Sequence, residues 1–294
     1  MAEGNARIAP TAHYTAQAWV RAGFPNSGIF DTPTGRTMFN ATQTLRRLGG
    51  PLLPPIIRHE SEHLFVRHFV HEERLRQLAP DYVLEVGAGL SPRGLTFASN
   101  NPELTYVEAD LPGMVAAKRE RLMRAGVALP PNYHLGTADL LGADLLGSLP
   151  VAPQKKQRVV VITEGVADYL NMDEKRTAFT NIASVLRAAG GGTYQAECYT
   201  RDRFVRYRSI SKFFTSALGL LVGASFEDRL FDSAPQALDF LRGCGFDTAE
   251  VLDSEALNPG PWRPPMDICP WQLLEARVKP AKASAKKTKK RSKK

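Results

Sequence analysis

The stretch YVLEVGAGLSPRG, from Tyr82 to Gly94, decides the fold class of this chain. A largely apolar run leads into a Gly-x-Gly turn, and a helix-compatible segment follows. A strand, a tight glycine turn and a helix place backbone N–H groups at the carboxyl edge of a parallel sheet, where doubly wound folds bind ligands. The stretch therefore predicts an α/β fold with a nucleotide-like ligand near Gly87 and Gly89.

The rest of the chain continues this alternation of short apolar runs and amphipathic segments. It ends in two strand-like segments, FDTAEVLD and WQLLEARV, which a proline-rich linker separates. Alternating strands and helices indicate a mostly parallel sheet, and the short linker indicates an antiparallel pair at its edge. We expect a helical N-terminal cap over residues 1–79, a Rossmann-like domain with a seven-stranded sheet over 80–278, and a tail over 279–294.

The residues of the turn distinguish between kinds of nucleotide. A dinucleotide-binding turn has a third glycine three positions after Gly89, where this chain has Pro92. Ser91 followed by Pro92 is typical of a helix start whose N–H groups are already capped or absent, so fewer donors remain for a pyrophosphate. Glu85 would repel phosphate but attract a cationic group. These features favour S-adenosylmethionine, which carries an amino group and no phosphate.

Acidic residues also follow the next three predicted strands. Asp110 comes about 20 residues after the turn, where a carboxylate can accept hydrogen bonds from both ribose hydroxyls. Asp139 and Leu140 follow the third strand and could contact an adenine. Glu164 ends an apolar strand, where glutamate is seldom buried without a partner. The alternative interpretations are capping roles for the aspartates and a structural ion pair for Glu164.

Several longer segments resemble one family. They are TAHYTAQAWVRAG, VLEVGAGLSPRG, YVEADLPGMVAAKRERL, GTADLLG and VVVITEGVADYLNMDEK. Together they resemble the leucine carboxyl methyltransferase and TcmP-like polyketide O-methyltransferase family of class I S-adenosylmethionine enzymes. The resemblance implies a Rossmann-like class I methyltransferase fold with S-adenosylmethionine as cofactor.

The resemblance also implies a role for each candidate residue. Gly87 and Gly89 would line the methionine part of the cofactor, and Glu164 would face its amino group. Arg58 would clamp the methionine carboxylate. The ribose and adenine would be held by the residues after the second and third strands, namely Asp110, Asp139 and Leu140. The family usually continues its turn with Asp-Thr-Arg, whereas this chain has Ser-Pro-Arg at 91–93.

The chemistry of methyl transfer makes few demands on the protein. It is an in-line displacement, and a carboxylate acceptor is already a nucleophile, so placement of the acceptor can supply most of the catalysis. A hydroxyl acceptor would gain from a general base, for which Tyr169 and His134 are candidates by their location near strand ends. Tyr14 and Trp19 are candidates for lining the pocket of a small-molecule acceptor. Packing is the alternative role for all four residues.

Three other functions stay open at this stage. HESEH, residues 59–63, matches the HExxH zinc pattern, with Glu60 as base. However, Glu62 and the nearby His68, His71 and Glu72 indicate a charged, solvated helix face, so no metal is predicted. A NAD-type dinucleotide oxidoreductase would require the missing third glycine. A nonenzymatic ligand-binding domain, with a tail that binds nucleic acid, is the third alternative.

The net charge of +8 originates in the tail. Residues 279–294 hold nine of the 38 Lys and Arg residues and no acidic one, which leaves 29 basic against 30 acidic residues elsewhere. A run this poor in apolar residues predicts disorder, with a solubilising role or weak contact with nucleic acid or an anionic surface.

The remaining composition indicates where the protein resides. Three scattered cysteines without a CxxC pair are typical of a reducing cytoplasm. The N-terminus lacks a signal-peptide pattern, and the apolar run at 216–226 is too short to span a bilayer. We therefore expect a soluble cytoplasmic protein with no membrane span.

Overall fold

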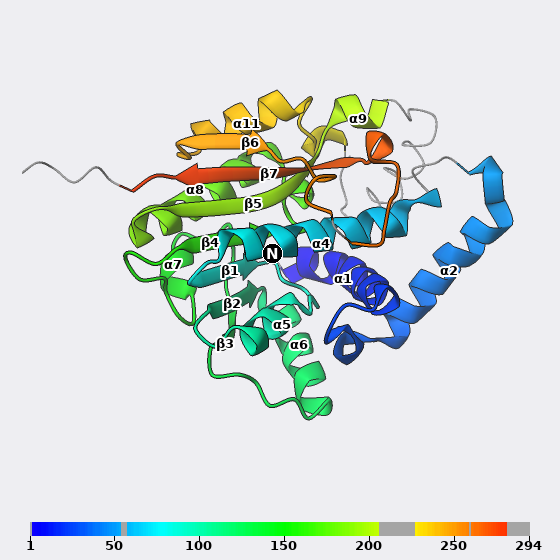
Figure 1. The fold of residues 1–294 in the computed structure, drawn as a ribbon, viewed down its shortest axis with the longest axis horizontal. Coiled ribbons are helices and arrows are strands. Elements are labelled where there is room, and N and C mark those ends of the chain that lie inside the picture. The colour runs from blue at the N-terminus through cyan, green and yellow to red at the C-terminus, as the bar shows by residue number, and fades with distance from the viewer. Residues whose placement is uncertain (1, 54–57, 206–226, 259, 281–294) are drawn as a thin grey trace, which may run out of the picture.

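A seven-stranded sheet forms the centre of the molecule (Figure 1). The computed structural model describes residues 2–53, 58–205, 227–258 and 260–280. The strands are β1 Tyr82–Val86, β2 Thr105–Asp110, β3 Tyr133–Thr137, β4 Val159–Thr163, β5 Gly192–Tyr199, β6 Thr248–Val251 and β7 Trp271–Val278. Their order is β3-β2-β1-β4-β5-β7-β6.

The strand directions confirm the predicted mixed sheet. Strands β1 to β5 pair in parallel with their neighbours, and β7 pairs antiparallel with both β5 and β6. Because β7 lies between β5 and β6, the antiparallel pair forms one edge of the sheet. Because β1, β2 and β4 run in parallel, their carboxyl ends lie at the same edge of the sheet. The loops that follow these strands therefore lie close together.

Helices cover both faces of the sheet. One face is packed against α4 (Glu60–Leu78), α5 (Arg93–Asn100) and α6 (Pro112–Arg124), and its core includes Val83, Tyr106 and Ile162. The other face is packed against α7 (Leu145–Ser148), α8 (Met172–Ala189) and α11 (Ala234–Gly243), around Leu84 and Val161. Successive residues of β1 and β4 therefore alternate between the two cores, as a buried strand requires.

The ends of α8 follow directly from its sequence. The side chain of Asn171 accepts hydrogen bonds from the N–H groups of Asp173 and Glu174, and Glu174 accepts one from the N–H of Asn171. This capping box satisfies free donors of the first turn. The helix ends at Gly190, whose φ of 94° is the left-handed conformation that favours glycine. A short segment, α9 (Arg201–Val205), follows β5.

The N-terminal residues are helical, as predicted, and lie beside the carboxyl ends of the parallel strands. They form α1 (Ala2–Ala22), the 3₁₀ turn η1 (Ser27–Phe30), α2 (Pro33–Gly49) and the 3₁₀ turn η2 (Gly50–Leu52). Figure 1 shows α1 and α2 on the side towards which the parallel strands point. Trp19 and Phe24 enter the same core as Val83, so the N-terminal helices share a core with the sheet.

Two of the expectations fall on residues outside the described ranges. Among the described residues, no helix combines the length and the apolar character needed to cross a membrane. The apolar run at 216–226 and the tail beyond residue 280 lie outside those ranges, so the expectations for them stay predictions.

Candidate active site

The glycine turn after β1 is joined to the end of β2 by hydrogen bonds. Gly87 and Gly89 have φ angles of 73° and 53°, which side chains other than glycine adopt only with strain. The N–H of Gly89 donates to Oδ2 of Asp110 at 2.7 Å, and the N–H of Leu111 donates to its Oδ1 at 2.7 Å. Desolvation raises the pKa of Asp110. The structure thus brings together the predicted glycine turn and Asp110, the residue predicted to bind the ribose.

Neighbouring elements approach this turn closely. A Cβ on Gly87 would lie 2.4 Å from Cγ2 of Val166, which follows β4. A Cβ on Gly89 would lie 3.5 Å from the Cβ of Ala12 in α1. The N-terminal helix therefore covers the turn, in agreement with the expected helical cap at the ligand edge.

Glu164 lies directly after β4 and is surrounded by cationic groups. Its side chain is 4% exposed. Its Oε1 lies 3.1 Å from Nε of Arg67, and its Oε2 lies 3.0 Å from Nδ1 of His68 and also contacts Arg93. Burial alone would raise the pKa of Glu164, but Arg93, His68 and Arg67 hold it well below its usual range. Glu164 is therefore ionised, and it lies at the carboxyl edge of the sheet, as predicted.

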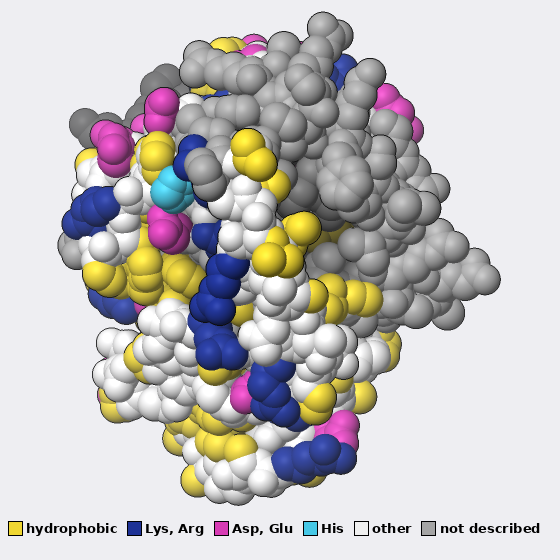
Figure 2. Space-filling model, turned by 90° about the vertical axis from the view of Figure 1, so that its right-hand side faces the viewer, with side chains coloured by type: hydrophobic (Ala, Val, Ile, Leu, Met, Phe, Trp, Pro, Cys, Tyr) yellow, Lys and Arg dark blue, Asp and Glu magenta, His cyan; other side chains and the backbone are white. Residues whose placement is uncertain are grey.

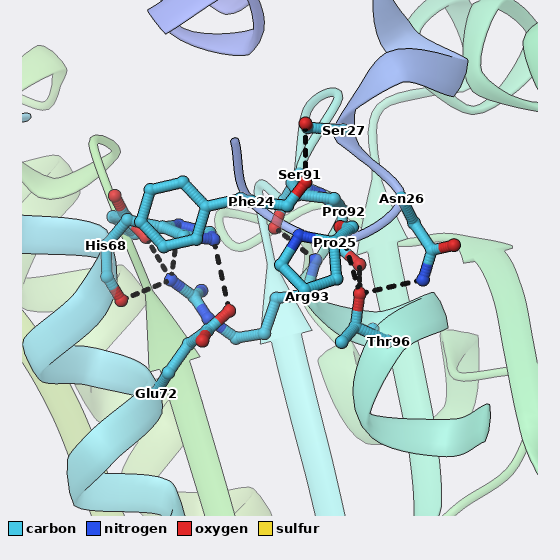
Figure 3. A network of polar contacts seen from close by, with 12 residues as sticks. Phe24, Pro25, Asn26, Ser27, His68, Glu72, Ser91, Pro92, Arg93 and Thr96 are labelled. Atoms are coloured by element: carbon cyan, nitrogen blue, oxygen red, sulfur yellow. Dashed lines mark hydrogen bonds and ion pairs between the residues drawn. The ribbon is translucent and has the colours of Figure 1, made fainter. Parts of the chain in front are cut away.

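Arg93 connects this carboxylate to the start of α5. Its Nη1 lies 2.8 Å from Oε1 of Glu85, and its Nη2 lies 2.7 Å from Nδ1 of His68. Figure 3 shows Arg93 extending from below Ser91 and Pro92 towards His68, with Phe24 beside the histidine ring. The side chain of Arg93 is completely buried, so it links α5, α4 and β1 inside the protein.

Glu85 has a different neighbourhood from the one expected. It is 2% exposed, and its Oε2 accepts a hydrogen bond from the hydroxyl of Tyr106 at 2.6 Å. With Arg93 on the other oxygen, both carboxylate oxygens have partners on the α4 and α5 side of the sheet. The alternation of β1 explains this, because residue 85 faces the same core as Val83. In this structure Glu85 offsets the charge of Arg93 at this interior position.

Arg67 lies beside Glu164 together with Arg93, and the sequence interpretation did not name Arg67 as a candidate. Besides Glu164, it contacts Oε1 of Glu197 at 3.4 Å and the hydroxyl of Tyr199 at 3.4 Å, both from β5. Arg58 lies nine residues earlier, just before α4, which is about 13 Å along a helix. Its backbone carbonyl accepts a hydrogen bond from Arg46 of α2. The role predicted for Arg58 at the methionine carboxylate stays a prediction.

The expected solvated face of α4 is wrong. Arg67, His68, His71 and Glu72 are each at most 6% exposed. Nε2 of His71 lies 3.3 Å from Oε2 of Glu197, and the carboxylate of Glu164 contacts both Arg67 and His68. The sheet supplies counter-charges that a single helix sequence does not reveal, and these compensate the burial of charged groups.

The two histidines of the HExxH segment have separate partners. Nδ1 of His59 lies 2.9 Å from Oε2 of Glu62, and Nε2 of His63 lies 3.2 Å from the carbonyl oxygen of Pro265. Burial lowers the pKa of His63 to about 4, so this ring is neutral at pH 7. In the part of the chain that the structure describes, no three His, Cys, Asp or Glu side chains form a group suited to a metal ion.

Asp139 and Leu140 lie in the loop after β3, as predicted. Oδ1 of Asp139 accepts a hydrogen bond from the N–H of Leu141 at 2.9 Å, which is a local loop cap. Leu140 is 7% exposed and packs in the core with Leu145. The backbone carbonyl of Leu140 accepts a hydrogen bond from Asn181 of α8 at 2.8 Å. Contact with an adenine stays a prediction for both residues.

The two candidate bases differ in position. His134 is the second residue of β3 and pairs in register with Val107, three positions before the carboxyl ends of β2 and β3. Tyr169 lies in the short 3₁₀ turn η3 (Ala167–Tyr169) after β4, and its side chain is hydrogen-bonded to Thr11 of α1. Burial raises the pKa of Tyr169, with Arg67 acting in the opposite direction. Of the two, only Tyr169 lies between the cap and the ligand edge.

The two aromatic candidates for the acceptor pocket are engaged in packing. The hydroxyl of Tyr14 donates to Oε2 of Glu60 at 2.7 Å, and its ring lies 5.6 Å from that of Phe39. The ring of Trp19 lies 4.5 Å from that of His68, and Trp19 is 6% exposed. Both residues thus hold the N-terminal helices to α4.

Comparisons with known proteins agree with this architecture. The family model described as Leucine carboxyl methyltransferase matches residues 25–183. No curated protein matches the chain. An O-methyltransferase family protein from Burkholderia thailandensis superposes with a TM-score of 0.51 at 16% identity, covering 82% of this chain and 64% of that one.

Two further solved structures resemble the chain. The S-adenosylmethionine-dependent methyltransferase SibL, in its apo form, has a TM-score of 0.50 at 14% identity, covering 76% of this chain and 58% of that one. PigF, solved with SAH, has a TM-score of 0.48 at 18% identity, covering 76% and 59%. The chain thus spans about six tenths of the length of these three proteins.

Proposed function

This chain belongs to the leucine carboxyl methyltransferase family, and from that premise we propose that it transfers a methyl group from S-adenosylmethionine to an oxygen of a small-molecule acceptor. The observation that carries the proposal is the junction between the glycine turn and Asp110, where the N–H of Gly89 and the carboxylate meet at 2.7 Å. This junction lies at the carboxyl edge of the sheet, where ligands of doubly wound folds bind.

The groups near the turn fit the two ends of this cofactor. Asp110 would accept hydrogen bonds from the ribose hydroxyls, and the residues after β3 would contact the adenine. At the methionine end, we assign the carboxylate clamp to Arg67 instead of Arg58, because Arg67 contacts Glu164 and Tyr199 at the strand ends. Glu164 would then offset the charge of the methionine amino group in the same place.

The acceptor follows from the chemistry of the transfer. The cofactor supplies an electrophilic methyl group, so the protein has to hold an acceptor oxygen in line with it and exclude water. A carboxylate needs no base for this step. A hydroxyl would release a proton, and Tyr169 is the described side chain that lies between α1 and the site. A small-molecule carboxylate or hydroxyl is therefore the proposed acceptor.

Calorimetric titration with S-adenosylmethionine, S-adenosylhomocysteine and NADH tests the cofactor. We expect the two sulfur compounds to bind and NADH not to bind. Asp110→Asn should weaken their binding by about tenfold or more, equal to about 1.4 kcal/mol. Arg67→Lys should have a similar effect because it keeps the charge but loses the planar fork, whereas the matched Arg58→Lys should change affinity by less than about twofold.

Transfer of labelled methyl from S-adenosylmethionine to a panel of carboxylic acids, phenols and amines then tests the acceptor class. Methylation confined to amines would contradict oxygen as the acceptor atom. Binding of NADH alone would replace the proposal by the oxidoreductase alternative. Binding of the sulfur cofactors without turnover on any acceptor would favour the nonenzymatic alternative.

A further inference from the structure

A cleft between α1, α2 and α4 lies in the helical cap, apart from the glycine turn. Its volume is about 520 Å³, which is in the range of small-molecule sites. Arg21, Arg46 and Arg47 line it together with Phe39 and Phe65. The three arginines come from the last turns of α1 and α2, so two separate helix ends converge on one cavity.

The cationic residues in the lining of this cleft outnumber the acidic ones. In the described ranges, Arg21, Arg46 and Arg47 take part in none of the ion pairs, which involve other arginines. Glu62 is the single acidic residue of the lining, and it pairs with His59 at 2.9 Å. Figure 2, which faces the side of the molecule carrying α2, shows Lys and Arg side chains gathered in a column down the middle of this face.

One of the arginines is fixed in place by neutral partners. Nη1 of Arg46 donates to the hydroxyl of Ser61 at 2.8 Å and to Oε1 of Gln43 at 3.2 Å, and Nη2 donates to the carbonyl of Arg58. These bonds orient the guanidinium, and the buried Glu60 offsets part of its charge. A preoriented cation loses little conformational entropy when an anion binds.

The walls of the cleft are partly apolar. Phe39 is 6% exposed and packs on Tyr14, and the ring of Phe65 lies 5.5 Å from that of Trp262. Arginines beside fixed aromatic rings suit a ligand that has both an anionic group and an apolar body. A free inorganic ion would use only the arginines.

We propose that this cleft, which we call the cap cleft, is a binding site for a small organic anion, a carboxylate on an aromatic or aliphatic body. The guanidinium groups of Arg21, Arg46 and Arg47 would hold the carboxylate, and Phe39 and Phe65 would contact the body. This proposal is independent of the cofactor assignment, since none of the residues of the cap cleft belongs to the candidate cofactor site.

The test uses the full chain and a pair of fluorinated probes followed by ¹⁹F NMR titration. The probes are 6-fluoro-2-naphthoate and its neutral counterpart, 6-fluoro-2-naphthalenemethanol. We expect the naphthoate to bind and the alcohol to bind about tenfold more weakly. The double variant Arg21→Gln/Arg47→Gln should weaken naphthoate binding by about tenfold, and added salt should weaken binding to the wild type.

Arg36→Gln on α2 is the matched control, because Arg36 is exposed, pairs with Asp31 and does not line the cleft. It should leave the naphthoate affinity unchanged. Equal affinity in the double variant and in the control would overturn the proposal, and so would the absence of naphthoate binding at about 10 mM. Titration of the same variants with S-adenosylhomocysteine separates this result from the cofactor site, since neither variant should change that affinity.

Discussion

At the residue scale, burial shifts the pKa of Asp168, and the charge of Glu197 adds to the shift. It lies in the turn after β4, and its Oδ1 accepts a hydrogen bond from the N–H of Tyr199 at 3.4 Å. Desolvation raises the pKa of this carboxyl to about 7, although Lys175 acts in the opposite direction. The ammonium of Lys175 donates to the carbonyls of Ala167 and Leu170. Asp168 is therefore half protonated near pH 7 in the folded protein.

This raised pKa predicts a stability that depends on pH. The folded state keeps the proton of Asp168 up to about pH 7, whereas the unfolded state releases it near pH 3.8. The wild type should therefore lose stability as the pH rises from about 4 to 7, by as much as about 4 kcal/mol, since one pKa unit equals about 1.4 kcal/mol. Asp168→Asn cannot ionise, so its stability relative to the wild type should increase across this window and level off above it.

Urea unfolding of both proteins at several pH values between 4.5 and 8.5 measures this difference in the free energy of unfolding. Asp239→Asn, on the exposed face of α11 where Asp239 pairs with Arg242, controls for the substitution itself. A difference between Asp168→Asn and the wild type that is constant over the whole range would contradict the prediction.

At the scale of elements, the turn after β1 depends on the segment after β4. Gly87→Ala would place a Cβ 2.4 Å from Val166 at a φ of 73°. We expect a strain of about 1–2 kcal/mol from the backbone and about 1–3 kcal/mol from overpacking. Gly126→Ala, at a φ of 64° with nothing within 4 Å of the added Cβ, should show the backbone part alone.

Denaturant unfolding of both glycine variants measures these two contributions. The double variant Gly87→Ala/Val166→Ala should recover much of the overpacking cost, because it shortens the side chain that the new Cβ meets. Equal destabilisation by Gly87→Ala and Gly126→Ala would show that the loop after β4 adjusts freely, and would remove the argument for a rigid junction.

Strands and turns were easier to predict from the sequence than the ion-pair partners of charged side chains were. Short apolar runs, the Gly-x-Gly turn and the spacing of Asp110 are local signals. They predicted the seven-stranded, mostly parallel sheet with its antiparallel edge pair and the location of Asp110 near the turn, but not the order of the strands. The charges of α4 were misjudged because their counter-charges lie directly after β4 and on β5 and β7, far away in sequence. Arg67 could have been found by one signal, namely its place on the same helix face as His71, in a helix that also carries the apolar Val66 and Val70.

At the scale of the whole molecule, the charges divide between a buried network and a terminal run. Inside, carboxylates on β1 and β5 and directly after β4 face the arginines and histidines of α4 and α5, which ties these two helices to the sheet. The excess of positive charge in the sequence resides in residues 279–294. The last strand ends just before it, and the N–H of Lys279 donates to Asp247 at 2.8 Å. We therefore expect the two sets of charges to have separate roles.

Deletion of residues 281–294 tests that separation. It removes eight of the nine basic residues of the tail, which leaves 30 basic against 30 acidic residues and a net charge near zero. The melting temperature and the affinity for S-adenosylhomocysteine should stay unchanged, because a run this rich in lysine and poor in large apolar residues has little apolar surface to bury. We expect the full chain to be retained on immobilised duplex DNA at about 50 mM salt and the deletion variant not to be retained. For the full chain, a log–log plot of DNA affinity against salt concentration should have a slope no steeper than about −7. DNA retention that survives the deletion would locate the contact on the rest of the chain, where the arginines of the cap cleft are one candidate.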